Sequence, residues 1–125
     1  MKRDMDFVRD LLLRIESGET NFAGAPKAFT GQPPNPEAEK LGEHLRLLKQ
    51  AGFVDVHAES LTGLIVVRGL SWRGHEFLDS VRDPKIWAKT KDGALAAGGF
   101  TVDLLKDLAK GFVKKQIEER TGVTL

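Results

Sequence analysis

The chain has 125 residues, of which 41% are hydrophobic and 30% charged, and these proportions fit one soluble globular domain with a modest core. Nineteen basic and eighteen acidic side chains leave a net charge of +1, so overall charge gives no argument for nucleic acid. Because there is no cysteine, disulfides and thiolate metal sites are excluded. No apolar run approaches membrane-spanning length, and MKRDMDFVRD carries acids where a signal peptide would be apolar, so we expect a cytoplasmic protein.

The N-terminal segment predicts a helix that ends near Gly18, where helices commonly stop. Apolar residues recur along one side at helical spacing: Met5, Val8, Leu12 and Ile15. Leu13 points away from this stripe, so the helix is either covered on two sides or offers an exposed contact. Residues 18–36 are rich in glycine and proline and predict a loop, with at most a short strand near Lys27 to Thr30.

Residues 35–51 carry the signals of a second helix at both ends. Asn35 is suited to cap the helix, and Pro36 suits its first turn. Four residues form the stripe expected to be buried: Ala38, Leu41, Leu45 and Leu48. After the last turn, a left-handed Gly52 would let Phe53 fold back on the helix, as in a Schellman cap.

Two short segments that follow predict a β-hairpin. Residues 53–58 (FVDVHA) alternate in polarity, and residues 64–69 (LIVVRG) are apolar and rich in β-branched side chains. Gly63, in the intervening ESLTG, supplies a residue suited to a turn. We therefore expect the two strands to pair antiparallel.

The stretch GLSWRGHEFLDSVRD, residues 69–83, brings a serine, a histidine and acids together and raises the question of catalysis. Ser71 is placed to cap a short helix, and it lacks the glycine spacing of a nucleophile elbow. His75 and Asp79 are one turn apart and would form a modest ion pair. The three histidines are scattered without the spacing of a metal site. We therefore expect no enzyme: no catalytic residue, no metal ligand and no cofactor.

Residues 83–99 predict another helix start and then a linker. Asp83 is a second cap, and Pro84 suits the first helical position before KIWAKTK. The small residues GALAAGG, 93–99, read as a flexible linker. We therefore divide the chain into a domain over residues 1–92 and a C-terminal segment over residues 93–125.

The last helix is predicted over residues 101–118, with Thr101 as its cap. It carries a broad apolar stripe: Val102, Leu105, Leu108, Ala109, Phe112 and Val113. Such a stripe is explained either by packing on the first helix or by contact with a second subunit.

The order of helix, loop with a short strand, helix, β-hairpin and helix is that of a winged-helix domain. We therefore predict an α+β, winged helix-turn-helix-like fold with a β-hairpin wing and an additional C-terminal helix. The helix over residues 35–51 would be the recognition helix, and the turn at 61–63 the wing tip.

Three segments resemble one family, catalogued as domain of unknown function 2513 and made up of small proteins of bacteria and their phages. They are MKRDMDFVRDLLLRIE, LRLLKQAGFV and GLSWRGHEFLDSVRDPKIWAKTK. The resemblance covers nearly the whole chain; it departs most in residues 18–34, and Ser71 stands where threonine is expected. It implies a layout similar to that of winged-helix regulators and a phage or prophage setting, without an established activity.

DNA binding is the first function that this fold suggests, with double-stranded DNA as partner. The candidate contacts lie on the recognition helix and around Pro84: Lys40, Glu43, Arg46, Lys49, Arg82, Lys85 and Lys89. The last three would share one side and contact the phosphate backbone if the helix continues through Pro84. However, Glu39 and Glu43 lie one turn apart on the outward helix face and would repel phosphates, and the turn ESLTG has no basic residue.

The alternative is an adaptor that keeps the winged-helix fold and binds a protein or a second copy of itself. Its candidate contacts are apolar residues outside or at the edge of the stripes: Leu13, Leu47, Leu108 and Phe112. The charge on the recognition helix favours this alternative by a small margin.

Overall fold

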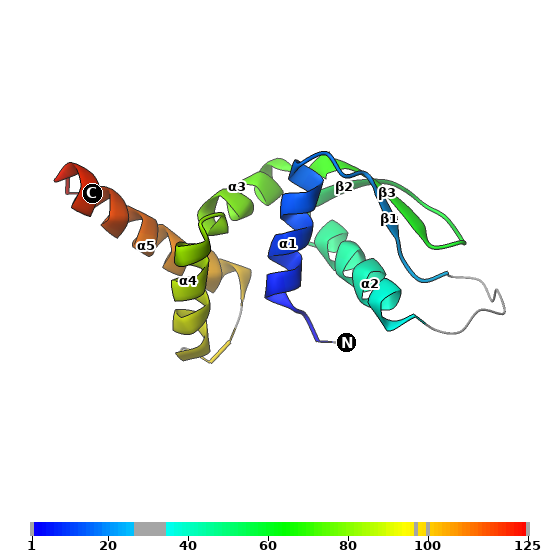
Figure 1. Ribbon diagram of the computed structural model, residues 1–125, viewed down its shortest axis with the longest axis horizontal. Helices are drawn as coiled ribbons and strands as arrows, with labels where there is room; N and C mark the ends of the chain where they lie inside the picture. The colour runs from blue at the N-terminus through cyan, green and yellow to red at the C-terminus, as the bar shows by residue number, and fades with distance from the viewer. Residues whose placement is uncertain (1, 27–34, 97, 100, 125) are drawn as a thin grey trace. The chain divides into compact units, whose positions relative to one another are not determined.

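A computed structural model describes residues 2–26, 35–96, 98–99 and 101–124 of the chain. Within them the protein is α+β, as predicted, with five helices and a three-stranded antiparallel sheet. The elements, labelled in Figure 1, are α1 (Met5–Glu16), β1 (Asn21–Ala23), α2 (Pro36–Gln50), β2 (Val54–Glu59), β3 (Leu64–Leu70), α3 (Trp72–Val81), α4 (Pro84–Ala96) and α5 (Val102–Thr121). The chain divides into two compact units, Met1–His75 and Glu76–Leu125. None of the helices in the described ranges is long and apolar enough to cross a membrane.

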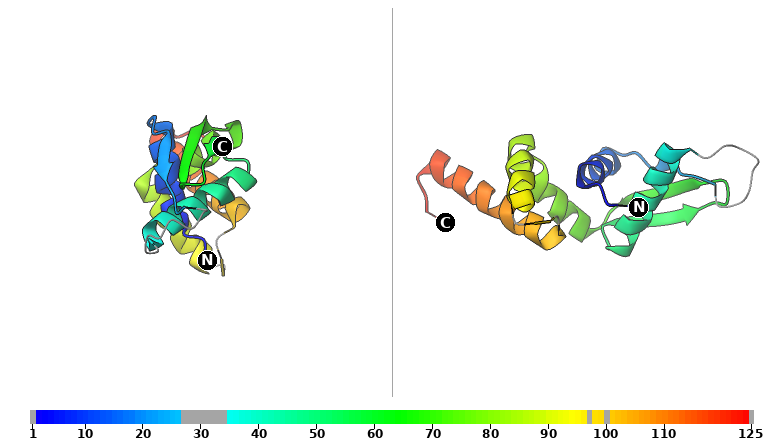
Figure 2. Two further views of the ribbon diagram at one scale, coloured as in Figure 1. Left: turned by 90° about the vertical axis from the view of Figure 1, so that its right-hand side faces the viewer. Right: turned by 90° about the horizontal axis from the view of Figure 1, so that it is seen from below.

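The first unit is built on the sheet, whose strand order is β1–β3–β2. Helix α1 contacts β3, and α2 contacts β1 and β2. The turn between β2 and β3 lies at the end of the sheet remote from α1 (Figures 1 and 2). The buried side chains of this unit are Met5, Val8, Leu11, Leu12, Ile15, Phe22, His44, Leu45, Leu48, Phe53, Val54, Ile65 and Val67.

Both ends of α2 form as the local sequence predicts. The Asn35 side chain accepts hydrogen bonds from the N–H groups of Glu37 and Ala38. Gly52 has φ +76°, and the Phe53 N–H donates to the Leu48 carbonyl at 2.9 Å, which confirms the Schellman cap.

The predicted buried stripe of α2 is only partly right. Leu45 and Leu48 are buried, but Ala38 and Leu41 are half-buried, while His44 is fully buried. A histidine was not expected at this position because its burial depends in part on a hydrogen bond from the N–H of Asp4, the N-cap residue of α1, which is distant in sequence.

One strand was missed. The strand suggested near Lys27 to Thr30 lies outside the described residues, and β1 forms at Asn21–Ala23, where a loop was expected. Phe22 of this strand is buried, and it stands opposite Ile65 of β3. A three-residue edge strand has too short a pattern to be predicted, because pairing with β3 stabilises it rather than its own sequence.

The second unit contains the C-terminal part of α3 with α4 and α5. Its buried side chains are Phe77, Leu78, Val81, Ile86, Trp87, Thr90, Ala94, Leu105 and Ala109. Asp83 caps α4 by accepting from the N–H groups of Lys85 and Ile86, at 2.8 and 3.2 Å. Thr101 caps α5, as predicted. Helix α5 contacts α4 in its own unit, which is neither of the two packing partners that its apolar stripe suggested.

The predicted glycine linker is wrong over residues 93–96. Helix α4 continues through Ala96, so the boundary expected between residues 92 and 93 falls inside a helix. A Cβ on Gly93 would lie 3.3 Å from a methyl carbon of Leu108 in α5. The small residue therefore allows close helix packing, which composition alone does not distinguish from flexibility.

The premise that helix continues through Pro84 is also wrong. Helix α3 ends at Val81 and α4 begins at Pro84, so Arg82 lies between two helices. Proline lacks an N–H and its ring clashes with the preceding turn, which is why a new, Asp83-capped helix starts there.

Candidate functional site

Helix α2 presents an acidic outward face, as the spacing of Glu39 and Glu43 predicts. Glu39, Glu43, Lys49 and Gln50 are exposed, and Leu47 is half-buried. Of these groups only Lys49 is cationic, and it lies in the last turn. The exposed face by itself therefore favours a cationic or neutral partner over a phosphate backbone.

The two other cations of α2 are held by acidic side chains within the first unit. The Lys40 Nζ lies 2.8 Å from a carboxylate oxygen of Asp4, and it stands over the Phe7 ring at 4.7 Å. The Arg46 guanidinium lies 2.7 Å from a carboxylate oxygen of Glu59 in β2. These ion pairs tie α2 to the start of α1 and to the sheet, so neither cation is directed at a partner.

Asp4 has two functions in this arrangement. Its carboxylate accepts the Phe7 N–H at 3.1 Å, capping α1, and it pairs with Lys40. The hydrogen bond from the Lys40 ammonium, followed by that from the Phe7 N–H, holds the pKa of Asp4 below its ordinary value of 3.8. The carboxylate form is therefore the one that stabilises the fold.

Replacing Asp4 by asparagine should remove the negative charge and keep the helix cap, because asparagine caps helices as well as aspartate does. We expect a loss of about 0.5–1 kcal/mol in the free energy of unfolding at neutral pH, as for a partly exposed ion pair. The folded pKa of Asp4 is depressed, so this stabilisation is complete above the unfolded pKa and disappears as pH falls through the folded pKa. Urea denaturation from neutral to strongly acidic pH should show wild type and Asp4→Asn converging; a constant difference would contradict the assignment.

The turn between β2 and β3 carries apolar rather than basic side chains. Leu61 is 67% exposed and Leu64 is 44% exposed. Ala23, opposite Leu64 in β1, and Ala58, opposite Val66 in β2, are exposed as well. An antiparallel sheet with one solvated face usually carries polar residues there, so this apolar surface is suited to a partner. We call Leu61, Leu64, Ala23 and Ala58 the hairpin surface.

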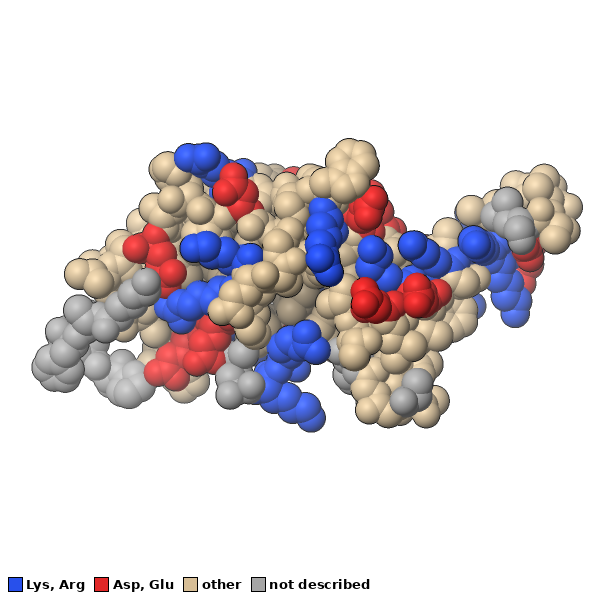
Figure 3. Space-filling view, turned by 180° about the vertical axis from the view of Figure 1, so that it is seen from behind, with Lys and Arg blue, Asp and Glu red and all other residues tan. Residues whose placement is uncertain are grey.

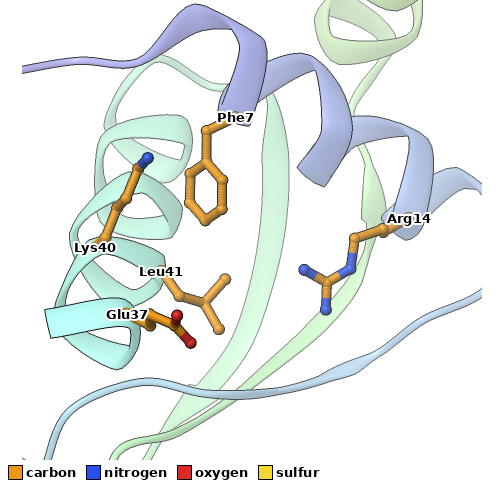
Figure 4. A pocket seen from close by; sticks show the side chains of 5 residues that line it. All are labelled: Phe7, Arg14, Glu37, Lys40 and Leu41. Carbon is orange, nitrogen blue, oxygen red and sulfur yellow. The ribbon is translucent and has the colours of Figure 1, made fainter. Parts of the chain in front are cut away.

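A cleft of about 380 Å³ opens between α1 and α2. Figure 4 shows its lining: Phe7, Arg14, Glu37, Lys40 and Leu41. Arg14 is paired with Glu19, whose oxygen lies 2.6 Å from the guanidinium, and Lys40 is paired with Asp4. This pairing raises the pKa of Arg14 and lowers that of Glu19. The described lining has no serine or histidine, and its cations are already neutralised, which gives the cleft little means to bind an anion.

The serine and histidine of the stretch 69–83 are used structurally. The Ser71 Oγ accepts the Gly74 N–H at 3.1 Å and donates to the Gly52 carbonyl, so it caps α3, as predicted, and holds the end of α2. The expected pair between His75 and Asp79 is wrong. His75 lies 3.9 Å from Glu16, while Asp79 pairs with Arg82 at 2.7 Å. Arginine competes better for the carboxylate because it is always charged.

The remaining predicted residues lie in several places. Lys85 and Lys89 are exposed on α4, and Arg82 precedes that helix in a pair with Asp79. The four apolar interface candidates, Leu13, Leu47, Leu108 and Phe112, are all half-buried. Leu108 packs beside Gly93 of α4, so its role lies within the second unit.

The sequence patterns did not predict the exposure of the two leucines of the hairpin surface. Leu61 and Leu64 lie in a turn and at a strand start, where periodicity carries no signal. Trp72 is 80% exposed, whereas Trp87 is buried. Over the described ranges, no cluster of three histidine or acidic residues is arranged to hold a metal ion.

Comparison with known proteins finds similarity over most of the chain. The model of a family described as a hypothetical protein, DUF2513, matches residues 2–100. A protein of Haemophilus influenzae, described as an uncharacterized protein, is 30% identical over 121 residues, which cover 94% of this chain and 99% of that protein. No solved structure matches the chain significantly. The matched range includes α1, α2, the sheet, α3 and α4.

Proposed function

The chain belongs to the DUF2513 family of hypothetical proteins, and from that premise we propose that it is a non-enzymatic binding protein of winged-helix-like fold that acts through protein contacts. The binding surface would combine the outward face of α2 with the hairpin surface. The cytoplasmic location and the phage or prophage setting implied by the resemblance stay predictions.

The observation that carries the proposal is the commitment of Lys40 and Arg46 to Asp4 and Glu59. A winged-helix protein that binds DNA presents its recognition helix and its wing to phosphates and bases. Here the corresponding helix exposes Glu39 and Glu43, and the corresponding hairpin exposes leucines. Acidic and apolar groups at these places suit a protein partner with cationic and apolar side chains.

The order of α1, β1, α2 and the β2–β3 hairpin supports the winged-helix part of the proposal. In a helix-turn-helix, another helix directly precedes the recognition helix. Among the described residues β1 precedes α2, and the segment between them includes residues 27–34, which lie outside that range.

The non-enzymatic part of the proposal is supported by Ser71, whose hydroxyl forms hydrogen bonds with the backbone of Gly52 and Gly74.

The first test is titration of the full chain with mixed-sequence duplex DNA at low and physiological salt. We expect no binding by the wild-type protein. A matched variant with Glu39→Lys and Glu43→Lys should gain weak, salt-sensitive binding, because it reverses the charge on the same face without touching the buried residues. Salt-sensitive binding by the wild type would contradict the proposal.

The second test concerns the hairpin surface. Host-cell proteins that the wild-type chain captures should no longer be captured by a variant in which Leu61 and Leu64 are both changed to serine. The control is Leu95→Ser, because Leu95 is 63% exposed but lies on α4 in the other unit. If the Leu61 and Leu64 double variant and the Leu95→Ser variant capture these proteins equally well, the partner does not bind at the hairpin surface.

Binding to the DNA backbone, the regulator-like function, is a second candidate. It is favoured by the exposure of Lys85 and Lys89, one turn apart on α4, and of Lys49 on α2. Against it, Figure 3 shows acidic side chains beside the row of Lys and Arg along α5, so that helix has no uniform cationic surface. If the wild type binds DNA, the variants Lys49→Ala, Lys85→Ala and Lys89→Ala should each reduce the dependence of DNA affinity on salt concentration.

A further inference from the structure

Strands β2 and β3 each carry one extra residue at the same point of their pairing. The successive pairs at this point are Asp55 with Gly69, Val56 with Val67, and Ala58 with Val66. Arg68 is therefore skipped on β3 and His57 on β2, and the register is the same on both sides of the interruption. Bulges of this kind re-aim side chains and are common beside functional sites.

The two bulges decide which side chains of β2 and β3 face the core. Without them, strand alternation from Glu59, which is paired with the buried Ile65, would put His57 on the inner side of the sheet and Val56 on the outer side. With them, Val56 pairs with the fully buried Val67, while His57 and Arg68 are both exposed. The polar pair is thus placed at the surface by the bulges.

These two exposed side chains are hydrogen-bonded to each other. The Arg68 Nη2 lies 2.6 Å from the His57 Nδ1. Arginine can only donate, so Nδ1 accepts and the proton of the histidine ring is on Nε2. Among the residues that the structure describes, no carboxylate forms an ion pair with Arg68. The pair therefore offers N–H donors and one uncompensated positive charge, and its chemical complement is an oxyanion.

Small residues flank the pair and leave room for a ligand on the outer face of the sheet. A Cβ added to Gly69 would meet no heavy atom of the described residues within 4 Å, apart from its chain neighbours. On the other side, Ala58 is exposed, and its partner Val66 is half-buried. Leu64 of the hairpin surface follows along β3. Asp55, opposite Gly69, is an exposed acid beside the pair, and it weakens the attraction for an anion.

We propose that Arg68 and His57 bind a carboxylate of an apolar protein segment that lies along the outer face of β2 and β3. The guanidinium fork suits the two oxygens of a carboxylate, and the His57 Nε2–H supplies a further donor. A carboxylate is favoured over a DNA phosphate because the neighbouring Val66 and Leu64 are apolar and the pair carries a single charge. This segment is a different part of the partner from the cationic side chains that suit α2. That the carboxylate belongs to a protein rests on the proposed function, whereas the oxyanion site itself does not.

Titration of the isotope-labelled full chain with a blocked tripeptide of glutamate, alanine and leucine tests the site by NMR. We expect saturable shifts of the amide signals of Arg68 and His57. Arg68→Gln should weaken binding about tenfold or more, because the charged fork is lost. Asp55→Asn should strengthen binding, because it removes a like charge beside the ligand. The control is Lys49→Gln, which removes the same charge from an exposed position of α2 and should leave the affinity unchanged. The amide spectrum of each variant checks that it is folded.

Two further probes identify the chemistry that the site prefers. The same tripeptide with glutamine in place of glutamate should show no saturable shifts, since it has no negative charge. Inorganic phosphate at equal ionic strength should compete more weakly than the glutamate peptide, because it has no apolar part to contact Val66 and Leu64. Equal binding of the two peptides, an Arg68→Gln variant that binds as the wild type does, or stronger competition by phosphate would overturn the proposal. None of these measurements uses the protein partner or the outward face of α2, so their failure is distinct from a failure of the proposed function.

Discussion

Replacing Gly74 by alanine should lower the free energy of unfolding by about 3 kcal/mol or more. A Cβ at this position would lie 2.1 Å from the Phe53 carbonyl oxygen and 3.0 Å from its carbon, and both are backbone atoms that have no rotamer to adopt. The same carbonyl accepts the Ser71 N–H at 2.9 Å, which joins the start of α3 to the residue before β2. Relief of the clash would therefore break this contact.

Gly111 provides the control for the same chemical change. It lies in the middle of α5, and among the described residues no atom other than the adjoining helix itself would come within 4 Å of an added Cβ. Gly111→Ala should therefore raise stability by about 0.5–1 kcal/mol, since alanine loses less backbone entropy in a helix. Urea denaturation of the two variants should give effects of opposite sign. A Gly74→Ala protein within about 1 kcal/mol of wild type would contradict the close approach of α3 to Phe53.

Replacing His44 by alanine should lower the free energy of unfolding by about 2–4 kcal/mol. His44 is fully buried, and its Nε2 accepts the Asp4 N–H at 3.0 Å. Its Nδ1 lies 2.8 Å from the Lys40 carbonyl, which can only accept, so this nitrogen carries the proton. The ring also meets Phe7 edge-on, with centroids 4.9 Å apart. The alanine variant leaves a cavity and a backbone N–H without its acceptor.

His75→Ala is the matched histidine control. His75 is exposed and its contact with Glu16 is long, at 3.9 Å, so its loss should change stability by less than about 0.5 kcal/mol. Chemical denaturation of both variants at the same pH separates the two positions. Similar small losses for both would show that His44 does not join α1 to α2.

The candidate binding surface depends on the same contacts. Asp4, Lys40 and His44 hold the start of α1 against α2, and Arg46 holds α2 to Glu59 of β2. These three interactions leave the carboxylates of Glu39 and Glu43 as the charged groups in the middle of the outward face. The cations seen in the sequence of α2 therefore stabilise the position of the helix, while its acids define the exposed charge.

The elements that the sequence by itself determined are those whose signals are satisfied within a few residues. Asn35 caps the N–H groups two and three positions ahead, and Gly52 ends α2 because it adopts positive φ without strain. Ser71 and Thr101 cap their helices in the same way. The hairpin followed from two apolar segments joined by a turn with Gly63. Local hydrogen bonds of this kind need no knowledge of the rest of the chain.

Only the tertiary structure decided which charges are paired within the protein and which glycines lie against another element. Lys40 meets Asp4 across 36 positions, and His44 meets Asp4 across 40. In the sequence Gly93 resembles a linker residue, but it lies against Leu108 of α5. Gly74 resembles an ordinary helical glycine, but it lies against the backbone of Phe53. In each case the decisive neighbour comes from a distant part of the chain, so its position depends on how the elements pack.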